Sequence, residues 1–407
     1  MNELRVRTYN VMFGEAILIS VPDEDDSGHE VTRHILIDVG SSCPVGRMDA
    51  IFSGVIEDVL AVLNGQPLDL YVMTHEHIDH VKGLYHYDQN ILLQHDLKDK
   101  LRIQNAWLTG SSDPDYYTSG KHPEAKKKLD IAEDAFHHVE KLQAAAPELP
   151  GYVRSVMAIN EPGVRETRVQ YLRGLADDPV YVYRGLDIAQ KHPFRKAAIK
   201  LLAPEEDTSE YYGTFHPVAL AAAPGEPGYA STDWGMVVPP SGVDAGAFYN
   251  LVTLRRDGYY DNLLALDEAQ NNTSVVFQLE WQGWKLLFPA DAEIRSWKEM
   301  NKRGLLEAVD FLKIGHHGSK NATPPPMLLE KLFPDDGVQR YAVVSTYPDE
   351  DETIDEFVHN EVPDRETLQR IRHRNVHIES VIGLPDAGYI DYTFHPTQKT
   401  VRIERSG

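Results

Sequence analysis

A run of histidines and acids directly after a short apolar segment is the feature that most constrains what this chain can fold into. Residues 68–73 have the apolar character of a buried strand, and the polar run after them contains His75, His77, Asp79 and His80. In a tight loop after a strand, the first two histidines can face one metal ion, and Asp79 and His80 can face a second. Imidazole and carboxylate are ligands that zinc and similar ions take in hydrolytic sites. The run therefore predicts a metal site at a strand end, against the alternative of a solvated, histidine-rich turn.

The spacing of apolar residues predicts an α/β protein. Strands are expected at residues 4–11, 16–21, 34–37, 68–73, 273–280, 285–288, 311–314, 341–345, 376–382, 389–394 and 400–403. Helical spacing predicts helices over residues 47–63 and 125–146, and a further helix is expected within residues 186–202. Both kinds of element are therefore expected in one fold.

The strand-rich segments lie at the two ends of the chain. We expect one sheet-based domain from residues 1–90 and 262–407, with residues 91–261 inserted as a long, partly helical lid or cap. Within that insertion, residues 98–200 hold 17 Lys and Arg against 14 Asp and Glu, a balance of +3, so the rest of the chain carries −26. A covering insertion of this kind could receive a phosphate-containing substrate, although an ordinary helical subdomain is the simpler alternative.

Composition narrows the class of protein. Hydrophobic residues make up 42% of the 407 residues and charged residues 25%, which is typical of a globular protein. The net charge of −23 argues against a protein that coats nucleic acid or lies on an anionic membrane. The single cysteine, Cys43, excludes a disulfide framework, so a metal must be held by histidine and carboxylate. Because no apolar run approaches the ~18 residues of a membrane span, we expect a cytoplasmic protein without membrane contact.

The spacing of the histidine-rich run resembles the His-x-His-x-Asp-His signature of the metallo-β-lactamase fold. The resemblance implies an αββα sandwich with two divalent metal ions, zinc or manganese, and it demands further polar residues at strand ends. An acidic residue is expected at the end of an early strand, where Asp38 follows residues 34–37. A carboxylate that bridges the metals is expected after a later strand, where Asp291 lies shortly after residues 285–288. Both residues occur in the expected order.

The last ligand of the family is a histidine after another strand, and this chain offers two. His316 and His317 follow residues 311–314, and we favour His316 as the metal ligand. His317 could then donate a proton to a leaving group. Glu76, which lies between the ligands of the first run, is expected to be a solvated loop carboxylate.

Further segments resemble the soluble metallo-β-lactamase domain of ComEC-type competence proteins. These segments are residues 10–19, 272–276, 313–319 and 341–345. The resemblance covers residues 4–88 and about 262–405, and it does not cover the middle of the chain. That family usually has Gly-Gln-Gly-Asp where this chain has Met12-Phe13-Gly14-Glu15.

Two departures from the family affect the site. Many members carry a metal-binding histidine about twenty residues before the bridging aspartate, whereas here Asn271 is the best substitute, as a weak oxygen ligand. The metal near His75 and His77 is therefore expected to be held loosely, or to be manganese rather than zinc. The family's Gly-His-Pro segment reads Glu361-Val362-Pro363 in this chain, so a histidine that could assist catalysis is missing.

Together these features predict a metal-dependent hydrolase. The two ions would share a hydroxide whose pKa they lower, and they would stabilise charge on the substrate while Asp38 orients a metal-binding histidine. By analogy with ComEC-type domains, the favoured interpretation is a phosphodiesterase or nuclease, with DNA as one candidate substrate. The alternatives are a phosphocholine-type esterase or lactonase, and a binding module that has lost efficient catalysis. The expected metal ligands are His75, His77, Asp79, His80, Asp291, His316 and Asn271, and the expected catalytic residues are Asp79, His317 and Asp38.

Overall fold

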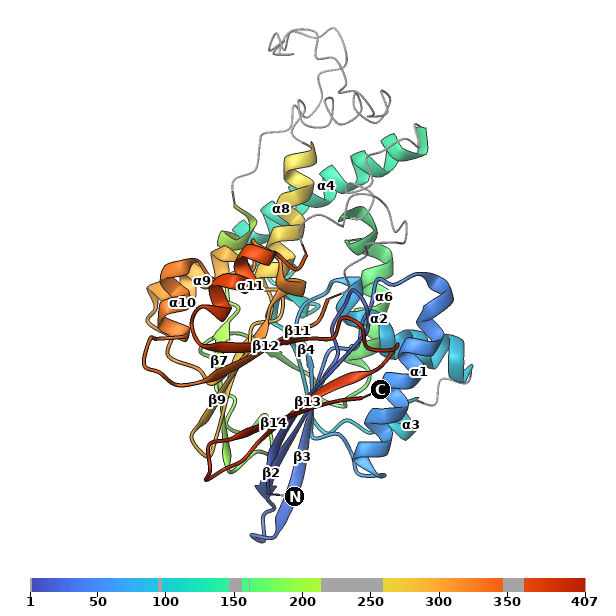
Figure 1. Ribbon diagram of the computed structural model, residues 1–407. Coiled ribbons are helices and arrows are strands. Elements are labelled where there is room, and N and C mark those ends of the chain that lie inside the picture. Colours follow the sequence, from blue (N-terminus) through green and yellow to red (C-terminus); the bar gives the residue numbers. More distant parts are fainter. Residues whose placement is uncertain are drawn as a thin grey trace, which may run out of the picture.

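Two mixed sheets that face each other form the centre of the protein. The computed structural model describes residues 2–93, 97–145, 156–160, 162–213, 259–346 and 362–406 (Figure 1). The first sheet has the order β14 (Val401–Arg405), β13 (Tyr389–Phe394), β1 (Leu4–Tyr9), β2 (Ile17–Glu24), β3 (Glu30–Ile37), β4 (Leu70–Met73), β5 (Ala106–Thr109) and β6 (Val180–Val182). The second sheet has the order β12 (Val376–Ser380), β11 (Arg340–Val344), β10 (Phe311–Ile314), β9 (Trp284–Phe288), β8 (Val276–Trp281) and β7 (Ala197–Ala203).

Each sheet is antiparallel on one side and parallel on the other. In the first sheet, β14 to β3 pair antiparallel, and β3, β4, β5 and β6 pair in parallel. In the second sheet, β7, β8 and β9 pair antiparallel, and β9, β10, β11 and β12 pair in parallel. The carboxyl ends of parallel strands lie along one edge of a sheet, which is where α/β proteins commonly place their binding residues. Apart from Asn271, which lies on α8 (Tyr259–Asn272), the sequence-predicted site residues follow β3, β4, β9 and β10, so both sheets deliver them at such edges.

The inner faces of the two sheets share one apolar core. Val6, Ile19 and Ile35 of the first sheet are buried in the same cluster as Phe288 and Phe311 of the second. These side chains come from alternating strand positions, and that alternation gives each strand one face toward the opposite sheet. The shared core fixes the two site-bearing edges relative to each other.

Helices cover the outer face of each sheet. The first sheet carries α1 (Val45–Leu63), α2 (Ile78–His86) and α6 (Pro162–Arg173), and the second carries α9 (Ile294–Lys302), α10 (Pro326–Leu332) and α11 (Arg365–Arg372) (Figure 1). In α1, Ile51, Val55 and Val59 recur every four residues and are buried against the sheet, which is the spacing that makes a helix amphipathic. The helix ends at Asn64, whose φ of 47° is the left-handed conformation common at helix ends. The protein is thus an α/β fold with two mixed sheets flanked by helices, as expected.

Two longer helices pack on each other beyond the site end of the sheets. They are α4 (Pro123–Ala145) and α8 (Tyr259–Asn272), and Ala132 of α4 shares a buried cluster with Leu266 and Ala269 of α8 (Figure 1). The shorter helical segments are η1 (Tyr87–Leu92), α3 (Leu97–Lys100), η2 (Gly110–Ser112), η3 (Ser209–Tyr212) and η4 (His316–Gly318). Among the described residues, no helix combines the length and the apolar character that crossing a membrane requires.

The strands expected from the sequence are all present, and the bounds of β10 and β13 match the expectation. The helix expected within residues 186–202 is wrong, because the end of that stretch forms β7. Its residues alternate between buried and exposed, with Ile199 facing the core and Lys200 facing solvent, and this two-residue period outweighs the helix-forming tendency of its alanines and leucines.

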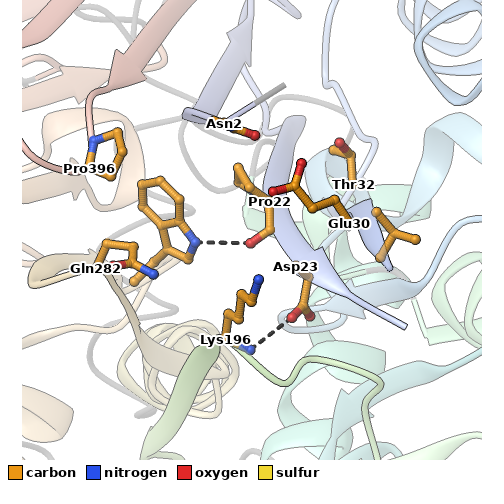
Figure 2. A pocket seen from close by; sticks show the side chains of 10 residues that line it. Asn2, Pro22, Asp23, Glu30, Thr32, Lys196, Gln282 and Pro396 are labelled. Carbon is orange, nitrogen blue, oxygen red and sulfur yellow. Dashed lines mark hydrogen bonds between the residues drawn. The ribbon is translucent and has the colours of Figure 1, made fainter. Parts of the chain in front are cut away.

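A buried carboxylate holds the start of β7 in place. Asp23 on β2 accepts the backbone N–H groups of Arg195 and Lys196 at 2.9 and 2.8 Å, and the indole nitrogen of Trp281 donates to the carbonyl of Pro22 at 3.0 Å. Figure 2 shows the bond from Lys196 to Asp23 and the bond that Pro22 accepts. Pro22, Asp23, Lys196 and Trp281 line a cavity, and none of the predicted site residues lies in its lining. The hydrogen bonds connect the two sheets at one edge.

The span expected as an insertion contributes to both sheets. Residues 91–261 supply β5 and β6 to the first sheet and β7 to the second, in addition to α4 and α6. These three strands were not anticipated from the sequence. The division of the chain at residues 90 and 262 remains a prediction.

Candidate metal centre

Four buried side chains converge between the two sheet edges. They are Asp79, His80, Asp291 and His317, and their potential ligand atoms all lie within 4.8 Å of one another; we call them the four-residue cluster. Nε2 of His80 is 3.2 Å from Oδ2 of Asp291 and 3.8 Å from Oδ2 of Asp79. Nε2 of His317 is 3.2 Å from the same oxygen of Asp79. Two imidazoles and two carboxylates thus face a common point.

The outer nitrogen of each histidine in this cluster is held by a partner. Nδ1 of His80 donates to Oδ2 of Asp38 at 2.8 Å, and Nδ1 of His317 donates to the backbone carbonyl of Ser345 at 3.0 Å. Both partners are acceptors, so each ring carries its proton on Nδ1 and can present Nε2 to the cluster. This arrangement is common around metals, where an outer hydrogen bond fixes the ring and its tautomer.

Acidic groups dominate the electrostatics of the cluster. Burial disfavours a charge on His80, but the carboxylates of Asp291 and Asp79 outweigh it and raise the pKa of His80 well above its ordinary range. In return, against their own burial, the pKa values of Asp79 and Asp291 are lowered, chiefly by the charge of His80. The cluster therefore stabilises positive charge, whether that charge is a proton or a metal ion.

The other two histidines of the run lie beside the cluster; we call His75 and His77 the histidine pair. Their ring centroids are 4.7 Å apart, and the ring of His75 is 4.1 Å from that of His80. The hydroxyl of Thr74 donates to Asp38 at 2.5 Å, so at 3.1 Å it accepts from Nδ1 of His75. Nε2 of His75 is buried and has no hydrogen-bond partner among the described residues. His75 thus presents an unused nitrogen lone pair.

The structure separates the two late histidines. His317 is fully buried and belongs to the cluster, whereas the side chain of His316 is 21% exposed, and its Nε2 lies 4.0 Å from Oδ2 of Asp291. Nδ1 of His316 lies 3.7 Å from Glu293. Burial lowers the pKa of His316, which favours a neutral ring. The sequence favours His316 as the ligand, whereas this geometry favours His317.

Asn271 lies at the end of α8, next to a carboxyl group that the sequence did not single out. Nδ2 of Asn271 donates to Oε1 of Glu293 at 2.9 Å, while its own Oδ1 is buried and has no hydrogen-bond partner among the described residues. Burial and the nearby Asp267 raise the pKa of Glu293 well above its ordinary range. Asn271 thus offers a free oxygen, but the four-residue cluster does not include it.

Backbone conformation supports a functional interpretation of these loops. Asp38, Ala290, His316 and His317 all have positive φ, at 48°, 48°, 45° and 54°. Such a conformation costs on the order of 1 kcal/mol or more for a residue with a side chain, and it concentrates at functional sites. Gly40 lets the backbone of its loop approach that of Asp79 closely, because an added Cβ would lie 2.3 Å from the backbone carbonyl of Asp79. The backbones of these loops are thus packed closely around the cluster.

A buried ion pair braces the opposite side of the site. Lys313 on β10 and Glu15 in the loop after β1 are 1% and 2% exposed and are paired through Nζ and Oε2. The backbone N–H of Glu15 donates to the carbonyl of Asp79 at 3.2 Å, and the ring of Phe13 lies 4.0 Å from that of His317. The loop after β1 and the segment that follows β10 therefore meet at the cluster.

Sequence reasoning missed the polar residues that come from the middle of the chain. Nε2 of His77 lies 3.1 Å from Oδ1 of Asn160, and Glu76 pairs at 3.4 Å with Arg165 of α6, instead of lying free in solvent as expected. Asp267 of α8 is also close, at 3.6 Å from Nε2 of His77. No motif marks Asn160 or Arg165, so only the fold could have identified them.

The donor set fits a divalent cation. The histidine rings of the cluster and of His75 each have one nitrogen held from outside and the other turned inward, and Oδ1 of Asp79 is buried without a partner among the described residues. Nitrogen and oxygen donors of this kind suit zinc, manganese and related ions. A buried histidine and aspartate cluster that can hold metal is therefore present. Neither a comparison with models of known protein families nor a comparison with curated proteins finds a match for this chain.

Proposed function

We propose that this protein is a metal-dependent hydrolase that cleaves phosphodiesters. The observation that carries the proposal is the four-residue cluster, with its donor atoms within 4.8 Å of one another at the ends of strands from both sheets. The resemblance of its motifs to the metallo-β-lactamase fold, and to ComEC-type domains in particular, supports the hydrolase class and the phosphodiester substrate.

The cluster would hold one ion, and the histidine pair could hold a second. When bound, such ions lower the pKa of water and polarise a phosphoryl oxygen. Asp38 and the carbonyl of Ser345 would keep the rings of His80 and His317 in the orientation that binding needs.

His316 is the residue best placed to move a proton. Hydrolysis forms a bond from the water oxygen to phosphorus, breaks the phosphorus–oxygen ester bond, and leaves an oxygen that needs a proton. The ring of His316 lies at the edge of the cluster and is partly exposed, and its Nδ1 has no hydrogen-bond partner among the described residues. It would take the proton from the attacking water and pass it to the leaving oxygen. This exchanges the roles that the sequence favoured for His316 and His317.

A small-molecule esterase or lactonase is the second candidate. It is favoured by the burial of the cluster, since Asp79, His80, Asp291 and His317 are each at most 3% exposed. A buried reaction centre suits a substrate that enters a narrow pocket better than one that lies across a surface.

One assay separates the two candidates. The purified protein, with Mn²⁺ or Zn²⁺, is incubated with single-stranded DNA, double-stranded DNA, bis(p-nitrophenyl) phosphate, p-nitrophenyl acetate and a simple lactone. We expect cleavage of the phosphodiesters at rates well above those of Asp79→Ala and His80→Ala. Turnover of the ester or lactone alone would favour the second candidate, and no turnover above the two variants would refute a hydrolase.

A further inference from the structure

We propose that Asn160 and Asp267 act as positioning residues that present Nδ1 of His77 to the metal of the histidine pair. This inference rests on the proposed metal centre and deepens it. It assigns a role to Asn160, which lies in the middle of the chain outside the resemblance, and to Asp267 of α8.

The hydrogen bonds of Asn160 fix the orientation of its amide. Nδ2 of Asn160 donates to the carbonyl of Val156 at 2.8 Å and to Oδ1 of Asp267 at 2.8 Å. Both partners accept only, so the amide nitrogen must face them and the amide oxygen must face His77. Asn160 is fully buried, which leaves its side chain little freedom to turn.

The orientation of the amide fixes the tautomer of His77. Oδ1 of Asn160 can only accept, so at 3.1 Å it receives the proton on Nε2 of His77. A neutral imidazole carries one proton, and Nδ1 is therefore left with its lone pair. Because only a nitrogen without a proton can bind a metal, His77 would bind through Nδ1, whereas His75 offers Nε2.

A second contact from the same part of the chain strengthens this arrangement. Arg165 of α6 pairs with Glu76 at 3.4 Å, and Glu76 lies between the two histidines of the pair. The segment that carries Asn160 and the helix that follows it therefore contact adjacent residues of the metal loop. The middle of the chain would thus help to build the metal centre rather than only cover it.

Asp267 has an alternative role that the experiment must separate. Its Oδ1 lies 3.6 Å from Nε2 of His77, so it could in principle replace the missing histidine of the family as a direct ligand. Nε2 of His77 already has Asn160 as its partner, and the contact of 2.8 Å between Asn160 and Asp267 is the shorter one. We therefore assign Asp267 to the support of Asn160.

The test measures Zn²⁺ binding without any assay of turnover. Metal-free full-length protein is titrated with Zn²⁺ against a chromophoric chelator, and bound zinc is counted by elemental analysis. The variants are Asn160→Ala, Asp267→Asn and the exchange Asn160→Asp with Asp267→Asn, which moves the carboxylate to position 160 and the amide to position 267. Asn105→Ala is the matched control, because Asn105 is a partly buried asparagine that donates to a backbone carbonyl away from the site.

We expect Asn160→Ala to weaken one of two zinc equivalents by about 10- to 100-fold, the usual effect of losing an outer partner of a metal-binding histidine. The affinity for the other zinc equivalent should not change. The Asn105→Ala protein should bind both equivalents as the unmodified protein does. The exchange variant should recover part of the affinity, because the carboxylate introduced at position 160 still accepts from His77 and the amide introduced at position 267 still donates to that carboxylate. Recovery is incomplete because a carboxylate cannot donate to the carbonyl of Val156 as the amide of Asn160 does.

Four results would overturn the assignment. If Asn160→Ala binds both equivalents normally while Asp267→Asn loses one, Asp267 is a ligand and not a support. If the exchange variant binds zinc no better than Asn160→Ala, the hydrogen bonds from His77 to position 160 and on to position 267 do not determine zinc affinity. If Asn160→Ala fails to fold, the exchange variant still tests the positioning role, because its side chains keep the size and shape of the original ones. If the unmodified protein binds no zinc or manganese, the proposed function fails as well, whereas normal binding in every variant refutes the positioning role alone.

Discussion

The two halves of the proposed metal centre are supported by different parts of the chain. The four-residue cluster is held by Asp38 and the carbonyl of Ser345, which follow β3 and β11 at the ends of the two sheets. The histidine pair is held by Thr74 on one side and by Asn160, from the middle of the chain, on the other. The first half is thus a product of the sheets alone, while the second also needs the middle of the chain to be in place. We therefore expect the four-residue cluster to bind its metal tightly. We expect the histidine pair to bind its metal only when the middle of the chain is in place.

The largest expected effect comes from removing a ligand of the four-residue cluster. His317→Ala should abolish its metal equivalent and lower phosphodiester hydrolysis by about three orders of magnitude, since a metal contributes several kcal/mol and each 1.4 kcal/mol is tenfold. His316→Ala should keep both metal equivalents even though its turnover falls. Zinc content by elemental analysis checks the pair of variants. Metal loss in His316→Ala, with retention in His317→Ala, would restore the assignment favoured by the sequence.

The second-largest expected effect comes from breaking the buried ion pair between Lys313 and Glu15. Lys313→Met leaves Glu15 buried without its partner, and we expect a loss of about 3–5 kcal/mol in the free energy of unfolding, measured with urea. Because the loop of Glu15 contacts Asp79 and His317, metal binding should weaken in the cluster more than in the histidine pair. The double variant Glu15→Gln, Lys313→Met removes both charges and should recover much of the stability. A single variant as stable as the double one would show that the pair does not brace the cluster.

These contrasts also explain how much could be predicted from the sequence. Asp79 and His80 were identified by the spacing of the histidine-rich run. Asp38 and Asp291 were identified because the resemblance of that run calls for carboxylates at strand ends, which local pattern can locate. The sequence favoured His316 over His317, whereas the geometry favours His317, because adjacent residues at positive φ point in directions that no spacing rule gives. The sequence could not identify Asn160, because its role depends on a contact with His77, which lies 83 positions away along the chain. Strand β7 was missed for a related reason, as its place is set by Asp23 and β8 rather than by its own composition.

The stability of the fold should depend on pH through His34, which lies on β3 and is not one of the proposed metal ligands. Burial, with a smaller contribution from Arg5, lowers the pKa of His34 on β3 from 6.5 to about 4. The folded state therefore takes up this proton less readily than the unfolded state, and stability should be undiminished above pH 6.5 and fall as pH drops from 6.5 to 4, by about 3 kcal/mol. Urea unfolding in the presence of a chelator excludes effects of metal release. His34→Gln should remove this part of the pH dependence, and an unchanged slope in that variant would show that other groups cause it.

The smallest expected effect decides whether Asn271 belongs to the histidine pair. Asn271→Ala removes the hydrogen bond to Glu293, which should cost about 1 kcal/mol in the free energy of unfolding. If the buried Oδ1 of Asn271 also faces the metal of the pair, one zinc equivalent should weaken by about tenfold, as expected for a residue that supports a site rather than dominating it. The four-residue cluster does not include Asn271, so its equivalent should bind unchanged. Equal weakening of both zinc equivalents would instead mean that Asn271 acts on both halves through Glu293. The two halves would then be less independent than their separate supports imply.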